Sequence, residues 1–242
     1  GLVGSEMCIR DSYNNVLRRC RPVRPLKDPN GYYMSDINYI EALQNGGRQN
    51  EINDGLSQQV RITITPLKNW NIIGELNIKT DNNWTHYEHK RVYSHMANDP
   101  EKTYVATMTG PSEDKVYEYA YKSLFLNPNV YTNYDITLGQ HTIAATAGMQ
   151  IERQKYRDVS AQRADMISTD LPVLNLTTSS QSYGISGVVQ EWASAGFFGR
   201  INYDYAGRYL VEGNLRYDGS SRFRRGNRWI LTPSFSLGWN IA

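Results

Sequence analysis

Hydrophobic and polar residues alternate strictly along residues 199–219, on both sides of a break at Ala206 and Gly207. Alternation with a period of two is typical of strands that turn one face to an apolar environment and the other to water. Two small residues between two such runs predict a tight β-hairpin turn. The side chains of the apolar face are Ile201, Tyr203, Tyr205, Tyr209, Val211, Leu215 and Tyr217. Whether this face meets a protein core or lipid decides the class of the protein.

The same pattern predicts two further hairpins, with turns at residues 66–69 and 138–141. Between the hairpins lie two long polar stretches, residues 83–122 and 157–190, with only weak periodicity. The sequence therefore predicts an all-β protein in which short turns alternate with long loops at one end. This layout is typical of an antiparallel transmembrane β-barrel with strands of about 9–12 residues. Loops of this length are uncommon in a compact soluble domain.

The last predicted strand, residues 229–241, carries Trp229 and Trp239 ten positions apart on one apolar face. Ten residues of strand span about 33 Å, and a tilt of about 40–45° reduces this to roughly 24 Å across a membrane. This height matches the apolar band of an outer-membrane barrel, which aromatic residues border at both interfaces. We therefore predict lipid outside and water inside. The predicted membrane-interface aromatic residues are Tyr203, Tyr205, Tyr209, Trp229 and Trp239.

Composition narrows the remaining classes of function. A formal net charge of +2 with 21% charged residues gives no basic signature for binding nucleic acid. The sequence contains no run of 18 apolar residues, so it predicts no transmembrane helix. The chain has 18 tyrosines against 5 phenylalanines, and tyrosine suits a boundary between apolar and aqueous phases because its ring is apolar and its hydroxyl is polar.

No pattern in the sequence predicts an enzyme, a cofactor site or a metal site. His86, His89 and His95 lack the spacing of a zinc site, and the first two would point to opposite faces of an extended chain. No nucleophile motif or phosphate-binding loop is present, so we assign no catalytic residues. A basic cluster contains Arg222, Arg224, Arg225 and Arg228, and its loop either contacts anionic lipid or packs against its neighbours.

A longer motif lies near the C-terminus of the sequence. Residues 191–223 read EWASAGFFGRINYDYAGRYLVEGNLRYDGSSRF, and residues 226–241 begin with GNRW and end with PSFSLGWNI. Together they resemble the SusC/RagA family of TonB-linked outer-membrane transporters of Bacteroidetes, with a weaker likeness at residues 126–152. The matching positions are Gly199, Arg200, Asn202, Tyr203, Tyr205, Gly207, Arg208, Tyr209, Leu210, Glu212, Arg216, Tyr217, Asp218, Gly219, Ser220, Ser221, Arg222 and Phe223.

This resemblance implies a plugged barrel of about 22 strands in the outer membrane. Such a barrel would import large nutrients such as oligosaccharides or peptides, powered by the TonB complex and covered by a SusD-like surface lipoprotein. Residues 13–242 would be a partial TonB-dependent receptor β-barrel domain, without the plug domain and the remaining strands. Residues 1–12 resemble a non-native read-through peptide. The alternative that the residues leave open is a secreted soluble β-sandwich that binds glycan or protein.

Overall fold

The computed structural model describes residues 27, 29, 31, 44–96, 99–105, 113–179 and 183–241. Residues 1–12 lie outside this described part of the chain. No helix among the described residues has the length and apolar character needed to cross a membrane. The elements of the described part are β1 (Gln49–Leu67), β2 (Trp70–His89), β3 (Tyr93–Met96), β4 (Asp99–Val105), β5 (Lys115–Leu138), β6 (His141–Ala164), β7 (Tyr183–Tyr205), β8 (Tyr209–Ser220), the 3₁₀ helix η1 (Arg225–Asn227) and β9 (Trp229–Trp239).

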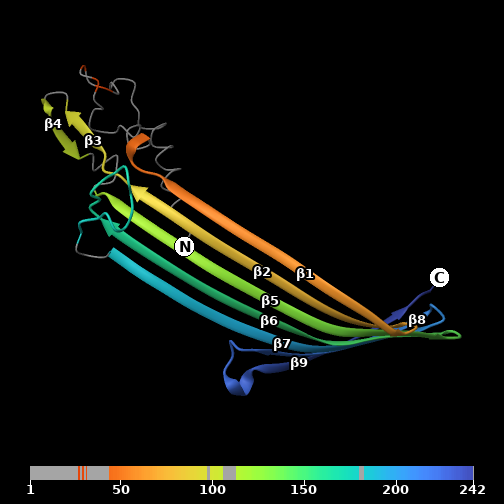
Figure 1. Ribbon diagram of the computed structural model, residues 1–242. Coiled ribbons are helices and arrows are strands. Elements are labelled where there is room, and N and C mark those ends of the chain that lie inside the picture. The colour runs from red at the N-terminus through yellow and green to blue at the C-terminus, as the bar shows by residue number, and fades with distance from the viewer. Residues whose placement is uncertain are drawn as a thin grey trace. The chain divides into compact units, whose positions relative to one another are not determined.

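Seven of these strands form one antiparallel sheet in the order β1-β2-β5-β6-β7-β8-β9 (Figure 1). Each strand pairs with the next one along the chain, except that the small β3-β4 hairpin is inserted between β2 and β5. Within the described strands, β1 and β9 are the two edges of the sheet, which is therefore open. An open all-β sheet with this order confirms the predicted fold class, a partial antiparallel barrel.

The three predicted hairpin turns are confirmed. They join β1 to β2, β5 to β6 and β7 to β8. The backbone passes through positive φ at Asn69 (65°), at Gly139 (62°), and at both Ala206 (55°) and Gly207 (68°). Two consecutive positive φ values characterise a type I′ turn, whose twist matches the right-handed twist of the flanking strands.

The strands are longer than the sequence predicted. β1, β2, β5, β6 and β7 contain 19 to 24 residues, against an expected length of about 9–12. The predicted loops at residues 83–122 and 157–190 are correspondingly too wide, because strands extend into both. The physical reason is that the backbone hydrogen bonds between strands form whether or not the side chains of one face are apolar. Arg153, Lys155 and Arg157 occupy alternate positions in β6 and continue the strand beyond its apolar part.

The chain divides into two compact units. Among the described residues, the first unit includes residues 44–52, 83–96, 99–105, 113–120, 159–179 and 183–187, and the second includes residues 53–82, 121–158 and 188–241. The first unit includes the bases of the two long connections, and the second includes the hairpin turns with β8 and β9.

The first unit contains a small buried core, which we call the loop base. Val116 is fully buried, Val92 is 1% exposed and Ala164 is 2% exposed. These side chains come from the start of β5, the residues after β2 and the end of β6. The connection between β2 and β5 and the start of the connection between β6 and β7 are therefore anchored at a closely packed core.

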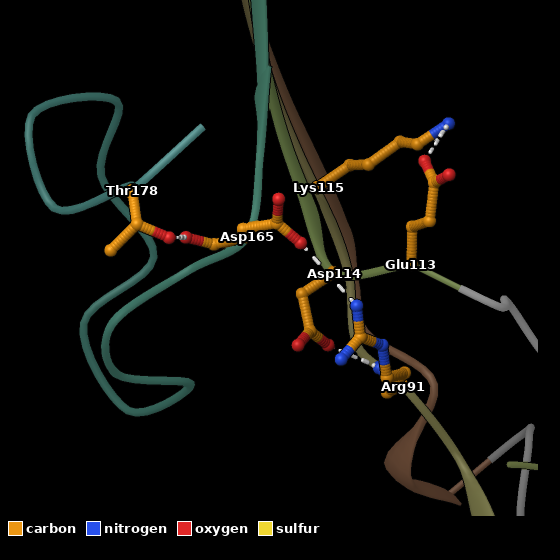
Figure 2. A network of polar contacts seen from close by, with 6 residues as sticks. All are labelled: Arg91, Glu113, Asp114, Lys115, Asp165 and Thr178. Atoms are coloured by element: carbon orange, nitrogen blue, oxygen red, sulfur yellow. Dashed lines mark hydrogen bonds and ion pairs between the residues drawn. The ribbon is translucent and has the colours of Figure 1, made fainter. Parts of the chain in front are cut away.

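A polar network, shown in Figure 2, accompanies the loop base. The backbone N–H of Arg91 donates to the carboxylate of Asp114, and the Arg91 guanidinium lies 3.4 Å from the carboxylate of Asp165. The backbone N–H of Asp165 donates to the carbonyl of Asp114 at 2.9 Å. The backbone N–H of Thr178 in turn donates to the carbonyl of Asp165 at 2.8 Å. The network satisfies backbone groups that burial would otherwise leave without a partner.

The second unit leaves its apolar faces exposed. On β9, Phe235 is 68% exposed and Leu237 is 71% exposed. Among the described residues of this unit, Ile73 is the one apolar side chain classed as buried. A soluble β-sandwich would pack these faces against a second sheet. The exposure disfavours that alternative and is the arrangement expected of a barrel wall in lipid.

Candidate functional site

The face of β7, β8 and β9 that carries the apolar side chains, here called the outer face, begins with a row of aromatic rings beside the β7–β8 turn. In the strand register Tyr205 lies opposite Tyr209, which lies opposite Trp239. Ring centroids are 6.3 Å apart for the two tyrosines and 6.5 Å apart for Tyr209 and Trp239, whose planes differ by 11°. The hydroxyl of Tyr203 lies 2.7 Å from Nδ1 of His141. The predicted aromatic residues near the turn therefore form one continuous cluster, the turn row.

A second aromatic cluster, the far row, lies at the other end of the same face. The Trp229 ring stacks on Tyr217, with centroids 4.8 Å apart, and also on Phe197 at 6.2 Å. Gly219 lies opposite Trp229 in the register, and a Cβ atom on this glycine would lie 2.6 Å from the indole ring. The glycine thus makes room for the tryptophan. Sequence reasoning did not name Tyr217 or Phe197 as interface residues, although their period-two spacing carried the signal.

Trp229 and Trp239 lie ten positions apart in β9, which corresponds to about 33 Å of strand. Two aromatic rows that border an apolar band would anchor a membrane strand at both interfaces. The five residues named from the sequence lie in these two rows, and their position at a membrane interface stays a prediction. The exposed apolar side chains between the rows are Ile201, Leu215, Leu231, Phe235 and Leu237.

The opposite face of the same strands, the inner face, is polar and paired within itself. Arg200 donates from Nε to Asn214 at 2.7 Å, and Asn214 donates to Glu212 at 2.6 Å. Arg216 donates from Nε to Asp218 at 2.7 Å. Charged groups are costly in lipid, whereas a water-filled or plugged lumen accepts them. The two faces of this sheet are therefore suited to two different solvents.

The inner face also holds a pocket of about 390 Å³, lined by residues of β6, β7 and the β8–β9 connection. One wall consists of Trp192 and Arg222, whose guanidinium carbon lies 4.8 Å from the centre of the indole ring. Arg222 therefore packs against the barrel wall, which is the second of the two alternatives for the basic cluster. Arg228 likewise donates from Nε to the carbonyl of Phe223 at 3.0 Å.

Two of the histidines considered for a metal site, His86 and His89, make other contacts. Nδ1 of His86 lies 2.6 Å from a carboxylate oxygen of Glu118. The ring of His89 contacts the hydroxyl of Tyr87, and burial, together with the nearby Lys115 ammonium, lowers the pKa of His89 below its usual value. Within the described part of the chain, no three His, Cys, Asp or Glu side chains are grouped closely enough to hold a metal ion.

The family model and the similar proteins all point to the same family. The family model described as TonB dependent receptor-like, beta-barrel, matches residues 12–242. TonB-dependent receptor P3 of Formosa agariphila is 26% identical over 140 residues, which are 58% of this chain and 14% of that receptor. TonB-dependent receptor SusC of Bacteroides thetaiotaomicron is 53% identical over 45 residues, which are 19% of this chain and 4% of SusC. The matched part of the chain thus spans 14% or less of these two relatives.

Solved structures with a similar fold include the RagAB peptide transporter, with a TM-score of 0.71 and 19% sequence identity. That match covers 82% of this chain and 21% of the transporter chain. The RagAB peptide importer in the open-open state matches with a TM-score of 0.69 and 19% identity, over 80% of this chain and 20% of that one. At this identity the likeness shows the fold, a segment of the wall of a much larger barrel.

Proposed function

Because this chain belongs to the TonB-dependent receptor-like β-barrel family, we propose that it is a wall segment of an outer-membrane importer of large nutrients. The nutrient class is oligosaccharide or peptide. The relatives are outer-membrane receptors of Bacteroidetes, so the outer membrane is the location of the chain, and the family is one of transporters and receptors.

The contrast between the outer and inner faces of β7–β9 carries this proposal. The outer face presents apolar side chains between two aromatic rows, and the inner face presents paired charges and amides. Lipid on one side and an aqueous or plugged lumen on the other is the environment that satisfies both faces at once. The predicted interface residues Tyr203, Tyr205, Tyr209, Trp229 and Trp239 would then fix the height of the wall in the membrane.

The wall would contribute to import by forming a passage, with no chemistry on the substrate and no cofactor. Residues 13–242 would form the wall, and residues 1–12 would lie outside it. In the whole transporter, a SusD-like surface lipoprotein would cover the entrance, and the TonB complex would supply energy. The similarity to SusC and to the RagAB structures supports these partners.

Tryptophan quenching in vesicles tests the membrane assignment. Two single-tryptophan variants of the chain, keeping Trp229 or Trp239, are refolded into phospholipid vesicles that contain brominated lipids. We expect both tryptophans to be quenched most by bromines close to the headgroups, because both would lie at an interface. A chain that remains soluble, monomeric and cooperatively folded without detergent would contradict the proposal and favour the soluble β-sandwich.

A further inference from the structure

The pocket on the inner face contains an arginine that is held in place by an aromatic ring. The Arg222 guanidinium lies over Trp192 at 4.8 Å. The indole is itself fixed, because its N–H donates to Gln154 at 2.9 Å and Gln154 donates to Ser123 at 3.2 Å. Among the described residues, Arg222 forms no ion pair with a carboxylate. Stacking therefore fixes the guanidinium while its N–H groups remain available to a ligand.

A carboxylate lines the same pocket from β6. One oxygen of Asp158 accepts the backbone N–H of Val188 at 2.8 Å, and within the described part of the chain Asp158 forms no ion pair. Asp158 and Arg222 therefore face one cavity without neutralising each other. An amide, Gln190, also lines this cavity from β7.

Several other charged groups on these strands already have partners. Arg153 and Lys155 both contact Glu191. In β6 these two residues alternate with those that line the pocket, so they lie on the opposite face of the strand. Glu152, which shares the inner face, accepts the hydroxyl of Ser194 at 3.2 Å. Within the described residues, neither pocket charge forms an ion pair, and a ligand with the complementary pair of charges would supply an oppositely charged partner to both.

We propose that this pocket binds a dipolar peptide segment of the imported substrate, with a carboxylate on Arg222 and an ammonium on Asp158. This inference rests on the proposed function and narrows its substrate class to peptide. The planar fork of arginine matches a carboxylate with two parallel hydrogen bonds. A neutral oligosaccharide could form hydrogen bonds to both side chains through its hydroxyls but would bring no opposite charge to either, so we expect it to bind more weakly than the dipolar peptide.

Trialanine with free termini, and the same peptide blocked by N-acetylation or by C-amidation, test the proposal. Binding is measured by calorimetry on the whole receptor that contains this wall segment, in detergent. We expect each block to weaken binding about tenfold or more, because each removes one charge-assisted contact. Arg222→Gln should abolish only the effect of C-amidation. Asp158→Asn, which keeps an acceptor for Val188, should abolish only the effect of N-acetylation.

Arg157→Gln is the matched control, because it removes an arginine next to Asp158 in sequence but on the opposite face of β6. This variant should keep both discriminations. If Arg222→Gln does not fold, Arg222→Lys keeps the charge without the planar fork and should weaken the C-amidation effect.

Equal affinity for free and blocked trialanine, tighter binding of maltotriose, or unchanged discrimination in both variants would overturn the inference. If the receptor imports peptide but both variants still distinguish free from blocked trialanine, the inference about this pocket fails and the proposed function stands. If the receptor is absent from the outer membrane, the proposed function itself fails.

Discussion

Two regions of this protein differ in how far their apolar side chains are exposed. On the outer face of β9, Phe235 and Leu237 are largely exposed, although they belong to a well-formed strand. At the loop base, Val92 and Val116 are almost completely buried and a polar network accompanies them. Moving an apolar side chain out of water lowers the free energy, whether the side chain enters a protein interior or lipid. The difference indicates that lipid surrounds the outer face and that water surrounds the loop base.

The two regions should therefore respond differently to substitution. Stability at the outer face depends on the match between side chain and lipid, so charge should matter more there than volume. Stability at the loop base depends on packing and on satisfied backbone groups, so loss of an acceptor should matter there.

Phe235→Arg should give the largest effect, because Phe235 lies near the middle of the apolar band between Trp229 and Trp239. A cation at this depth on the lipid face should lower the free energy of unfolding by about 2–4 kcal/mol. Urea denaturation in phospholipid vesicles measures this. Ser234→Arg is the control, since the neighbouring position points to the inner face, and its effect should stay within about 0.5 kcal/mol. Equal losses in both variants would contradict the assignment of lipid to the outer face.

Gly219→Ala should give the next largest effect. The new methyl would lie 2.6 Å from the Trp229 ring and would force the indole to move. Overpacking of this kind costs about 1–3 kcal/mol, and we expect a changed emission maximum for Trp229. Gly213→Ala is the control, because a Cβ atom there meets nothing within 4 Å. An unchanged Trp229 spectrum in Gly219→Ala would show that the far row is not closely packed.

Asp114→Ala perturbs the loop base and should have a smaller effect. The change removes the carboxylate that accepts the Arg91 backbone N–H, at a cost of about 1 kcal/mol. We expect faster hydrogen exchange at the Arg91 amide, measured by mass spectrometry on peptides that cover residues 86–96. Asp114→Asn keeps an acceptor oxygen and should retain most of the protection. Equal exchange in the alanine variant and the unchanged protein would mean that this contact does not stabilise the loop base.

The sequence predicted those features that depend on neighbours along one strand. Strict alternation identified the outer face and the turns, and the spacing of Trp229 and Trp239 identified two aromatic positions at its ends. Strand lengths could not be read in the same way, because polar alternation outside the apolar band looks like a loop. The loop base and the pocket beside Trp192 were also out of reach, because their members are far apart in sequence. Arg91, for example, meets Asp165 across 74 positions.

The smallest expected effect concerns the coupling between rings within one aromatic row. A double-mutant cycle with Tyr209→Ala and Trp239→Ala should give an interaction energy of about 0.5–1 kcal/mol, because the two rings stack. The free energies of unfolding are measured in phospholipid vesicles. The control cycle pairs Tyr209→Ala with Trp229→Ala, whose rings belong to different rows, and should be additive. Coupling of equal size in both cycles would mean that the rows do not act as separate clusters, and that loss of either one disturbs the whole outer face.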